Sequence, residues 1–439
     1  MRGTGRRLVP VDLWGNAMSD LPRHTDVVIV GGGAAGLAAA RQLTAAGTEV
    51  LLLEQADRLG GRITTDQADG FLLDRGFQVV NTGYPALADF VDVPSLDLRF
   101  FDHAVLVVDE RGRHLLADPR RQRDLPWPAR LPAPASGLAR LALLSLRLGY
   151  EDARRLRAEP ETTAAAYLAA RLDERTVRAL VEPFLTGVFG GQPLLTSSRV
   201  LAMIWRSFVR GRIGVPASGM QRLTQALAAP LPAGTVQLGT AVSAVTAAGA
   251  GQQVQTAAGT VTARAVIVAT DPAAAARLIP GLPVPAQRIL VTTYHAADEA
   301  PARRPVLLID GTGQTGIANS IVLTLAAPGY APPGRHLIAT TVTAEAGLDE
   351  PAVRRALAAL YGRPTSGWEH IATVRADPGL VTAPPPQGGL RQPVRLTSSL
   401  FVAGDHRDTP SLQGALVSGR RAARAVLSEL GVAALTQSG

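Results

Sequence analysis

The stretch from Asp26 to Gly36, which reads DVVIVGGGAAG, constrains the fold of this chain more than any other part of its sequence. Its β-branched residues at 27–30 predict a short buried strand. Gly31, Gly33 and Gly36 follow with GxGxxG spacing. These glycines allow a tight turn, close approach of a pyrophosphate to bare backbone, and close packing of the next helix on the strand. The start of that helix would point free N–H groups at the phosphates.

The residues that follow supply the rest of a dinucleotide site. The helix ends at Gly47, where a left-handed residue is expected, and Glu49–Glu54 predicts a second strand. Glu54 ends that strand at about the 20-residue spacing of the acid that holds ribose hydroxyls. Because strand, turn, helix, strand and acid occur in this order, we predict a dinucleotide-binding site.

Composition excludes several kinds of chemistry. The chain has 439 residues, 46% of them hydrophobic, and no cysteine. Disulfides, thiolate metal sites, a cysteine nucleophile and a flavin linked through cysteine are therefore excluded. The formal charge is +8, but lysine is absent and the arginines are scattered among few aromatic residues. We therefore expect no nucleic-acid partner.

Motifs for membrane insertion, metal binding and a serine nucleophile are also absent from the sequence. No run approaches the roughly 18 uncharged apolar residues of a membrane span, and residues 1–24 lack the apolar region of a cleaved signal. There is no metal-ligand spacing and no GxSxG elbow. We expect a flexible N-terminal tail over 1–24 and a cytoplasmic protein, with peripheral membrane contact left open.

A loop and a hairpin follow the ribose acid. The GGR run at 60–62 allows close backbone approach and lets Arg62 place a cation on a phosphate. Residues 64–74 predict a hairpin with its turn at Asp69-Gly70. Gly76 then interrupts the pattern, as at a place where something flat approaches the backbone.

Residues 95–215 have a different, mostly helical character. A hairpin is predicted from Asp102 to His114, and helices over Gly137–Tyr150, Thr162–Ala170, Asp173–Leu185 and Ser197–Val209. The leucine-rich helix Gly137–Tyr150 carries Arg140 and Arg147 on one face. This pattern favours a core helix with two snorkelling arginines over a membrane-surface or substrate-entrance helix.

The rest of the chain alternates strands and helices. Strands are predicted at Val236–Leu238, Ala241–Val245, Thr260–Thr270, Arg288–Tyr294, Ile321–Leu325, His336–Val342 and Ser399–Val402, and helices at Met220–Ala228 and Glu350–Tyr361. For the last helix we predict Thr409 as N-cap and Pro410 as the first helical residue.

Together these pieces resemble the FAD-dependent amine oxidase superfamily, most closely its phytoene-desaturase and protoporphyrinogen-oxidase-like branch. The segments that carry the resemblance, besides Glu54, are GGGAAG at 31–36, RLGGR at 58–62, DGFLLDRGFQ at 69–78, VPASGMQRL at 215–223, AVSAV at 241–245, AVIVAT at 265–270 and FVAGDHRDTPSLQGALVSG at 401–419. They lie in the family's order over nearly the whole chain.

The resemblance implies an α/β fold with a discontinuous Rossmann-like FAD-binding domain and a mixed α+β substrate domain. The expected segments are a tail at 1–24, FAD-binding segments at 25–95, 215–281 and 394–432, a mostly helical substrate insert at 96–214, a mixed substrate segment at 282–393, and a tail at 433–439.

The resemblance also implies residue roles. Glu54 would bind the adenosine ribose, Arg62 and the 31–36 loop the pyrophosphate, and Asp405 the ribityl-phosphate part. The backbone of Val242 would face the adenine, Gly76 to Gln78 the isoalloxazine, and the helix start at Leu412 the flavin N1 and C2=O edge. The expected cofactor contacts are Gly31, Gly33, Ala35, Gly36, Glu54, Gln55, Gly61, Arg62, Gly76, Phe77, Gln78, Val242, Asp405, Ser411 and Leu412.

A helix start at that edge would stabilise the negative charge that develops when a substrate C–H delivers hydride to flavin N5. Two departures from the family's pattern concern the substrate. Many of its amine oxidases place a lysine at N5 through water, and this chain has no lysine; they also frame the substrate with aromatics, and HRDTPSLQ at 406–413 has none.

We therefore expect a dehydrogenase or desaturase that binds FAD non-covalently and acts on a small lipophilic, isoprenoid- or polyene-like substrate. The alternatives are an oxidase of an amine or porphyrinogen-type substrate and a flavin-dependent isomerase. A non-enzymatic escort of prenylated proteins is a third alternative, against which the intact set of Glu54, Arg62 and Asp405 argues.

For a catalytic acid or base the sequence offers only candidates. His406 and Arg407 precede the last helix and could protonate or steer a substrate, or serve only to cap strands and contact the cofactor. Tyr294 and His295 are neighbours in a predicted strand, where structural roles are more common.

Overall fold

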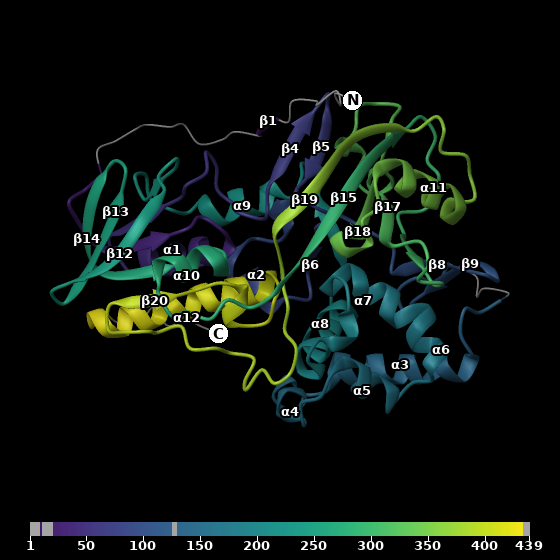
Figure 1. Ribbon diagram of the computed structural model, residues 1–439, viewed down its shortest axis with the longest axis horizontal. Coiled ribbons are helices and arrows are strands. Elements are labelled where there is room, and N and C mark those ends of the chain that lie inside the picture. The colour runs from purple at the N-terminus through teal and green to yellow at the C-terminus, as the bar shows by residue number, and fades with distance from the viewer. Residues whose placement is uncertain (1–8, 11–20, 125–129, 433–439) are drawn as a thin grey trace.

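The computed structural model describes residues 9–10, 21–124 and 130–432. Figure 1 shows two sheet-containing regions next to each other, with a group of helices below the second one. Within the described residues there are two sheets of seven strands and two of three. Each large sheet combines strands that are far apart in sequence, so the two regions alternate along the chain.

The first large sheet, called the first sheet below, has a parallel core. Its order is β11 (Val236–Gln237), β3 (Val50–Leu53), β2 (His24–Val30), β14 (Gly259–Val268), β13 (Gly251–Thr256) and β12 (Val242–Ala248), with β20 (Leu400–Val402) paired to the end of β14. β13 and β12 are antiparallel additions. The strands come from three separated parts of the chain, which confirms the predicted discontinuous Rossmann-like domain.

Helices cover both faces of the first sheet. α1 (Ala34–Ala45), α9 (Gln221–Ala228) and α12 (Leu412–Leu430) share a core with Val27 and Ile29. Val28 and Val30 point to the opposite face, where α10 (Pro272–Leu278) packs, because successive strand residues alternate in direction. α1 and α12 can lie close together because residue 419 is glycine: a Cβ on Gly419 would lie 2.1 Å from the carbonyl oxygen of Ala35.

The second large sheet, called the second sheet below, is antiparallel except for the pairing of β16 with β8. Its order is β19 (Glu369–Val381), β15 (Gln287–Ala297), β18 (His336–Thr343), β17 (Ile317–Val322), β16 (Leu307–Asp310), β8 (Ala104–Asp109) and β9 (Gly112–Ala117). α11 (Glu350–Tyr361) packs on it through Val353 and Leu357. The predicted mixed α+β region is confirmed, and the hairpin predicted from Asp102 to His114 is part of its sheet.

The helical group has a core of its own. It comprises α3 (Ala135–Tyr150), α4 (Ala153–Ala158), α5 (Ala164–Ala169), α6 (Glu174–Thr176), a π-helical turn (Val177–Val181), α7 (Glu182–Phe189) and α8 (Ser198–Arg210). The helix predicted at Asp173–Leu185 is present from Glu174, but a π-helical turn interrupts its α-helical hydrogen bonding and it continues to Phe189. Pro183 has no N–H with which to continue the α-helical ladder, and the π-helical turn precedes it.

Two small sheets join these parts. One contains β4 (Thr65–Ala68) and β5 (Phe71–Asp74), whose turn has φ of +49° at Asp69 and +82° at Gly70, as predicted for this hairpin. The other contains β6 (Val80–Asn81), β10 (Ile213–Pro216) and β7 (Leu98–Phe100), and α2 (Pro85–Phe90) follows β6.

Three further sequence predictions differ from the structure. The flexible tail predicted for 1–24 contains β1 (Val9–Pro10), which pairs with β4, and β2 already begins at His24. The strand predicted at Ile321–Leu325 ends at Val322, and Leu323–Leu325 forms a 3₁₀ turn. The helix predicted to begin at Pro410 begins at Leu412. Residues 433–439 and most of 1–20 lie outside the described residues, and the segment boundaries given above stay predictions.

Candidate cofactor and active site

The glycine loop between β2 and α1 is fixed by backbone geometry. Gly31 has φ of +106°, and a Cβ on Gly36 would lie only 1.9 Å from the carbonyl oxygen of Gly31. Neither position tolerates a side chain. Gly33 differs, since nothing lies within 4 Å of its Cβ position, and it caps α1 without any side-chain hydrogen bond. The first N–H groups of α1, including that of Ala35, are therefore left for an external acceptor.

Glu54 lies at the end of β3, beside this loop. Its Oε2 accepts a hydrogen bond from the Gly32 N–H at 2.6 Å, and its Oε1 accepts one from the Ala56 N–H at 2.9 Å. Gln55 is exposed. The Thr240 N–H donates to the Glu54 carbonyl at 2.8 Å, so the partly buried Val242 begins β12 close to this acid.

Arg62 and Asp405 bring the beginning and end of the chain together. The Arg62 guanidinium lies 2.8 Å from Asp405 Oδ2, and the arginine side chain is 36% exposed while the aspartate side chain is 8% exposed. Asp405 raises the pKa of Arg62. Asp405 belongs to the 3₁₀ turn Asp405–Arg407 directly after β20, and the exposed Gly61 has φ of +58°.

The loop from Gly76 to Gln78 leads from β5 toward the second sheet. Gly76 has φ of +98°. The Phe77 N–H donates to Thr292 Oγ1 on β15 at 3.1 Å, and Gln78 Nε2 donates to the Arg62 carbonyl at 2.6 Å. The other amide atom of Gln78, Oε1, is buried and has no partner among the described residues.

The start of α12 corrects one sequence prediction. Ser411, not Thr409, is the N-cap, and its Oγ accepts a hydrogen bond from the Gly414 N–H at 3.2 Å. Pro410 cannot be the first helical residue because the chain turns sharply here: a Cβ on Gly414 would lie 1.8 Å from the Thr409 carbonyl oxygen. Leu412 remains at the helix start, as predicted.

The two catalytic candidates differ in what they contact. The Arg407 guanidinium is turned inward and donates through Nε to the Pro393 carbonyl at 3.0 Å, with a second bond from Nη2. This contact fixes the loop before α12. Burial lowers the pKa of His406 to about 4, although Asp405 opposes the shift. Both ring nitrogens of His406 are buried without a hydrogen-bond partner among the described residues.

Tyr294 and His295 point to opposite faces of β15. The Tyr294 hydroxyl donates to the Asp74 carbonyl at 2.8 Å, on the side of the cofactor loops. His295 lies against α11, where its Nε2 is 2.9 Å from Glu350 Oε1, and burial lowers its pKa to about 4. The structure thus keeps His295 apart from the other candidates.

Sequence reasoning missed Asp74, Thr292 and Tyr330. The Tyr330 hydroxyl donates to Asp74 Oδ2 at 2.9 Å, and Thr292 holds the Phe77 N–H. The signal for Asp74 was present, because an acid ends the predicted hairpin next to Gly76. The sequence around Thr292 and Tyr330 contains no such signal, since only the folding of the chain brings these residues to this loop.

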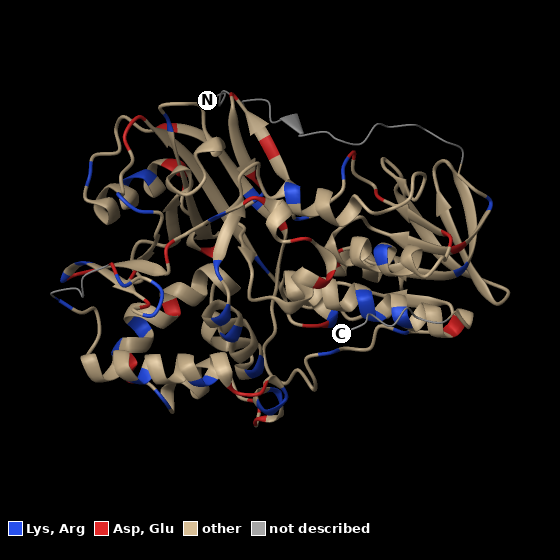
Figure 2. Ribbon diagram, turned by 180° about the vertical axis from the view of Figure 1, so that it is seen from behind, with Lys and Arg blue, Asp and Glu red and all other residues tan. Residues whose placement is uncertain are grey.

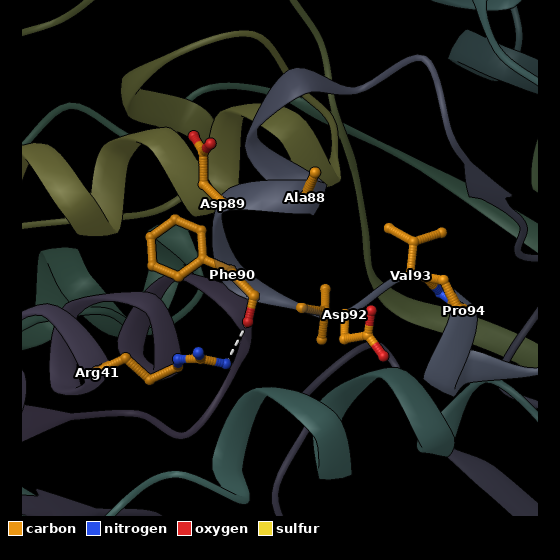
Figure 3. A pocket seen from close by; sticks show the side chains of 8 residues that line it. Arg41, Ala88, Asp89, Phe90, Asp92, Val93 and Pro94 are labelled. Atoms are coloured by element: carbon orange, nitrogen blue, oxygen red, sulfur yellow. Dashed lines mark hydrogen bonds between the residues drawn. The ribbon is translucent and has the colours of Figure 1, made fainter. Parts of the chain in front are cut away.

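A surface pocket elsewhere in the structure contains none of these residues. It has a volume of about 440 Å³ and is lined by residues of α1, α2 and the segment after α2 (Figure 3). Its Arg41 donates to the Phe90 and Ala226 carbonyls, so this guanidinium serves to join α1, α2 and α9.

The residues around the glycine loop fit a dinucleotide cofactor. The loop offers uncapped N–H donors and open space at Gly33, and Glu54 lies beside it with a nearly buried carboxylate. Near Arg62 and Asp405, Gln78 Oε1 and the His406 ring are buried polar groups that lack partners in the described part of the chain. Such groups are expected where a bound molecule completes the hydrogen bonding.

Comparison with known proteins agrees with this arrangement. The family model described as flavin containing amine oxidoreductase matches residues 34–427. Chloroplast protoporphyrinogen oxidase from Nicotiana tabacum is 30% identical over 192 residues, covering 41% of this chain and 32% of that protein. Coproporphyrinogen III oxidase from Propionibacterium freudenreichii is 31% identical over 177 residues, covering 38% and 32%. The matched parts therefore span about a third of the length of these curated relatives.

Solved structures extend the likeness to the whole fold. Cyclohexylamine oxidase from Brevibacterium oxydans superposes with a TM-score of 0.69 at 19% identity, covering 93% of this chain and 99% of that one. Such a likeness concerns the fold alone. The family model covers most of the chain, from the start of α1 at Ala34 through Glu54 to the greater part of α12. The chain therefore belongs to the flavin-containing amine oxidoreductase family, as its sequence predicted, and is a flavin-dependent oxidoreductase whose cofactor is FAD.

Proposed function

We propose that this enzyme removes a hydride from one carbon of a small lipophilic molecule and a proton from its neighbour, forming a C=C bond in an isoprenoid- or polyene-like substrate. Bound FAD supplies the chemistry by accepting the hydride at N5. The protein residues hold the cofactor, orient the substrate carbon and stabilise the charge that develops.

The observation that carries this proposal is the half-buried first part of β15 in the second sheet. β15 lies between β19 and β18, yet residues 287–291 are only half-buried, whereas 292–297 are buried. Among these half-buried residues, Leu290 is apolar and shares its face of β15 with Thr292 and Tyr294, whereas Val291 points to the other face and packs on the core beside α11. A Cβ on Gly76 would lie 3.9 Å from Thr292 Oγ1, so the stretch adjoins the loop expected beside the isoalloxazine. An apolar substrate would cover the Leu290 side chain.

Cofactor binding is proposed through the residues that the family resemblance indicated. Glu54 would hold the ribose, the uncapped start of α1 and Arg62 the pyrophosphate, and Asp405 the ribityl part. At α12, Ser411 uses the Gly414 N–H, which leaves the first N–H groups of the helix to stabilise negative charge ahead of Leu412. His406 is proposed as a cofactor contact or as the acceptor of the proton that the substrate releases, because its lowered pKa leaves the ring neutral. Arg407 is proposed only to hold the loop, because its guanidinium is engaged by Pro393.

An oxidase of a porphyrinogen or amine is the second candidate, favoured by the names of the matched relatives, which include a putrescine oxidase from Kocuria rosea. A flavin-dependent isomerase is the third. The lack of lysine and the apolar side chain of Leu290 weigh against an amine.

Anaerobic bleaching of the flavin absorbance separates these candidates. Purified enzyme is mixed without oxygen with an acyclic polyene precursor, a porphyrinogen or putrescine. We expect bleaching by the polyene precursor. Bleaching only by putrescine or only by the porphyrinogen would refute the proposed substrate class, and conversion of the polyene precursor without bleaching would indicate an isomerase. Isolation of the protein without any flavin would refute all three candidate functions.

Peripheral membrane contact is proposed through the outer face of α3. Leu143, Leu146 and Tyr150 are 66%, 41% and 66% exposed, while Leu144 and Leu148 on the inner face are buried. α3 contains no acidic residue, and Figure 2 shows arginines along it and in α4. This combination is typical of a helix that lies on an anionic bilayer. Among the described residues no helix is long and apolar enough to cross one.

Cosedimentation with vesicles of anionic or neutral phospholipid tests this contact. We expect binding to the anionic vesicles and roughly tenfold weaker partitioning for the L143S/L146S variant, because two leucines no longer insert. Val284, which is 52% exposed elsewhere, provides the control V284S. Equal partitioning of all three proteins would contradict the proposal.

A further inference from the structure

Asp74 is a buried carboxylate that makes no ion pair with a cation of the described residues. It is 2% exposed. Its Oδ1 accepts hydrogen bonds from the Thr65 hydroxyl at 2.6 Å and the Met220 N–H at 2.9 Å, and its Oδ2 accepts one from the Tyr330 hydroxyl at 2.9 Å. All three donors are neutral, and burial raises the pKa of Asp74 to about 6.

The neighbouring acid in the same hairpin has the opposite environment. Asp66 is paired with Arg58 and also lies 3.2 Å from Arg75 Nε. The two arginines therefore neutralise Asp66, whereas the contacts that Asp74 makes within the described residues balance its charge by hydrogen-bond dipoles alone. An uncompensated buried carboxylate costs stability, so it is expected where a charge has a use.

The partners of Asp74 come from both halves of the molecule. Thr65 belongs to β4 and Met220 precedes α9, whereas Tyr330 ends the 3₁₀ turn Pro328–Tyr330. Tyr294 of the second sheet donates to the Asp74 carbonyl at 2.8 Å. Asp74 thus ties the glycine-loop side of the molecule to the second sheet.

The next residues form the loop that contacts the cofactor site. The Gly76 N–H donates to the same Asp74 carbonyl at 2.7 Å, so Tyr294 and Gly76 share one acceptor. In the next two residues, the Phe77 N–H donates to Thr292 Oγ1 and Gln78 Nε2 donates to the Arg62 carbonyl. The position of Asp74 therefore determines where the loop Gly76–Gln78 starts and how it is oriented.

We propose that Asp74 is a positioning residue for the flavin. Its buried hydrogen bonds to Thr65, Met220, Tyr330 and Tyr294 fix the conformation of the loop Gly76–Gln78, and its carboxylate places a negative charge next to that loop. This inference rests on the proposed position of that loop beside the isoalloxazine. A fixed negative charge near a flavin disfavours the reduced, more negative form and so lowers the reduction potential.

The D74N variant tests the charge while keeping the shape. Its amide oxygen can still accept from Thr65 and Met220, and its NH₂ group can donate to the Tyr330 oxygen, which is also an acceptor. In the FAD-loaded wild-type enzyme we expect the flavin absorbance and reduction potential to change with pH around a midpoint near 6. The charged and titratable groups that face this site are Asp66 with Arg58 and Arg75, Tyr294 and Tyr330. In D74N we expect a raised potential and no such pH transition.

D310N is the matched control. Asp310 is also 2% exposed, and it accepts four hydrogen bonds from Thr312 and Thr315, but all of them lie within one turn of the second sheet. D310N should lower stability without altering the flavin potential or its pH dependence. If D74N does not fold, Y330F removes one donor to the carboxylate and should shift the midpoint of the pH transition upward, since the ionised form loses a hydrogen bond.

The possible results separate this inference from the proposed function. A flavin potential and pH transition unchanged in D74N, or unchanged in Y330F where D74N fails to fold, would overturn the role of Asp74, even if the polyene substrate still bleaches the enzyme. The same shift in D310N would also overturn it, because the effect would then be general. Bleaching by none of the three substrates would refute the proposed reaction and leave these spectral tests intact.

Discussion

The first sheet and the second sheet each have seven strands, but their functional positions are specified in different ways. Around the first sheet, backbone conformation and backbone contacts fix the functional positions: Gly31 has φ of +106°, and a Cβ on Gly36 would lie 1.9 Å from a carbonyl oxygen. Around the second sheet, hydrogen bonds from side chains fix the functional positions. Thr292 and Tyr294 on β15 reach the segment from Asp74 to Phe77, far away in sequence.

This difference explains why one family can act on many substrates. A backbone constraint allows only glycine, so the cofactor loop changes little while the cofactor stays the same. Side chains on a sheet, such as those at 289–291, can be exchanged without altering the fold. The comparison predicts that substitutions near the first sheet affect the whole enzyme, whereas those near the second sheet affect single properties.

The largest expected effect is that of G36A. The new Cβ must displace the Gly31 carbonyl or move α1, so we expect FAD binding to be lost and the free energy of unfolding to fall by roughly 3 kcal/mol. G33A is the matched variant. Its Cβ meets open space, so the fold should be kept, while the pyrophosphate loses its close approach and FAD binds at least about tenfold more weakly.

Chemical denaturation and FAD titration measure both variants. If G36A and G33A destabilise the protein equally, the glycine loop is not limited by backbone contacts, and the contrast between the two sheets fails.

E54A should have the next largest effect. Without the carboxylate the ribose hydroxyls lose a charged acceptor, so we expect FAD to bind roughly 100-fold more weakly. The control is E345A, which removes a half-exposed carboxylate near β15 and should leave FAD affinity unchanged. Full flavin occupancy in E54A would contradict the role assigned to Glu54.

Sequence reasoning was accurate where local patterns decide the structure. β2, α1, β3 and the hairpin of β4 and β5 follow from strand periodicity and from glycines that need positive φ. α11 was predicted with the bounds Glu350–Tyr361 that the structure shows, since Asp349 caps it and Gly362 ends it in a left-handed conformation. The start of α12 was missed by two residues because Thr409 and Ser411 both resemble an N-cap.

The parts that could not be predicted depend on contacts between distant segments. β19 carries Pro378 and Gly379, which hide a 13-residue strand from any periodicity rule. The buried partners of Asp74 were invisible for the same reason, as Tyr330 lies 256 residues away. The interpretation of Gly137–Tyr150 as a core helix holds for Leu144 and Leu148, but packing leaves Leu143 and Tyr150 exposed.

An effect confined to acidic pH is expected from His295 in the second sheet. It is fully buried, and its pKa is lowered from 6.5 to about 4, with burial as the main cause. Because the folded pKa lies below the unfolded one, this histidine contributes stability above pH 6.5 that is lost as the pH falls toward 4. The loss amounts to roughly 3 kcal/mol.

H295Q should remove that part of the acid sensitivity, as measured by urea unfolding between pH 7 and pH 4. The pKa of His406, next to Asp405, is lowered to about 4 as well. If FAD phosphates lie near His406, cofactor binding should raise its pKa and leave that of His295 unchanged, which ring NMR signals can follow. Identical responses of the two histidines to FAD would remove this distinction between the regions.

The smallest effect concerns two ion pairs, one in each region. Arg62 and Asp405 are 2.8 Å apart with a nearly buried carboxylate, whereas Arg288 and Glu345 are 3.1 Å apart with side chains 28% and 52% exposed. Solvent screens the second pair, so a double-mutant cycle of R288A and E345A should give a coupling below about 1 kcal/mol that shrinks further in salt. The Arg62 and Asp405 cycle should give about 2 kcal/mol with little salt dependence, because burial strengthens a charged hydrogen bond. Equal coupling in both cycles would mean that the Arg62 and Asp405 pair stabilises the fold no more than an exposed ion pair does. The residues around the first sheet would then be held in place by backbone contacts.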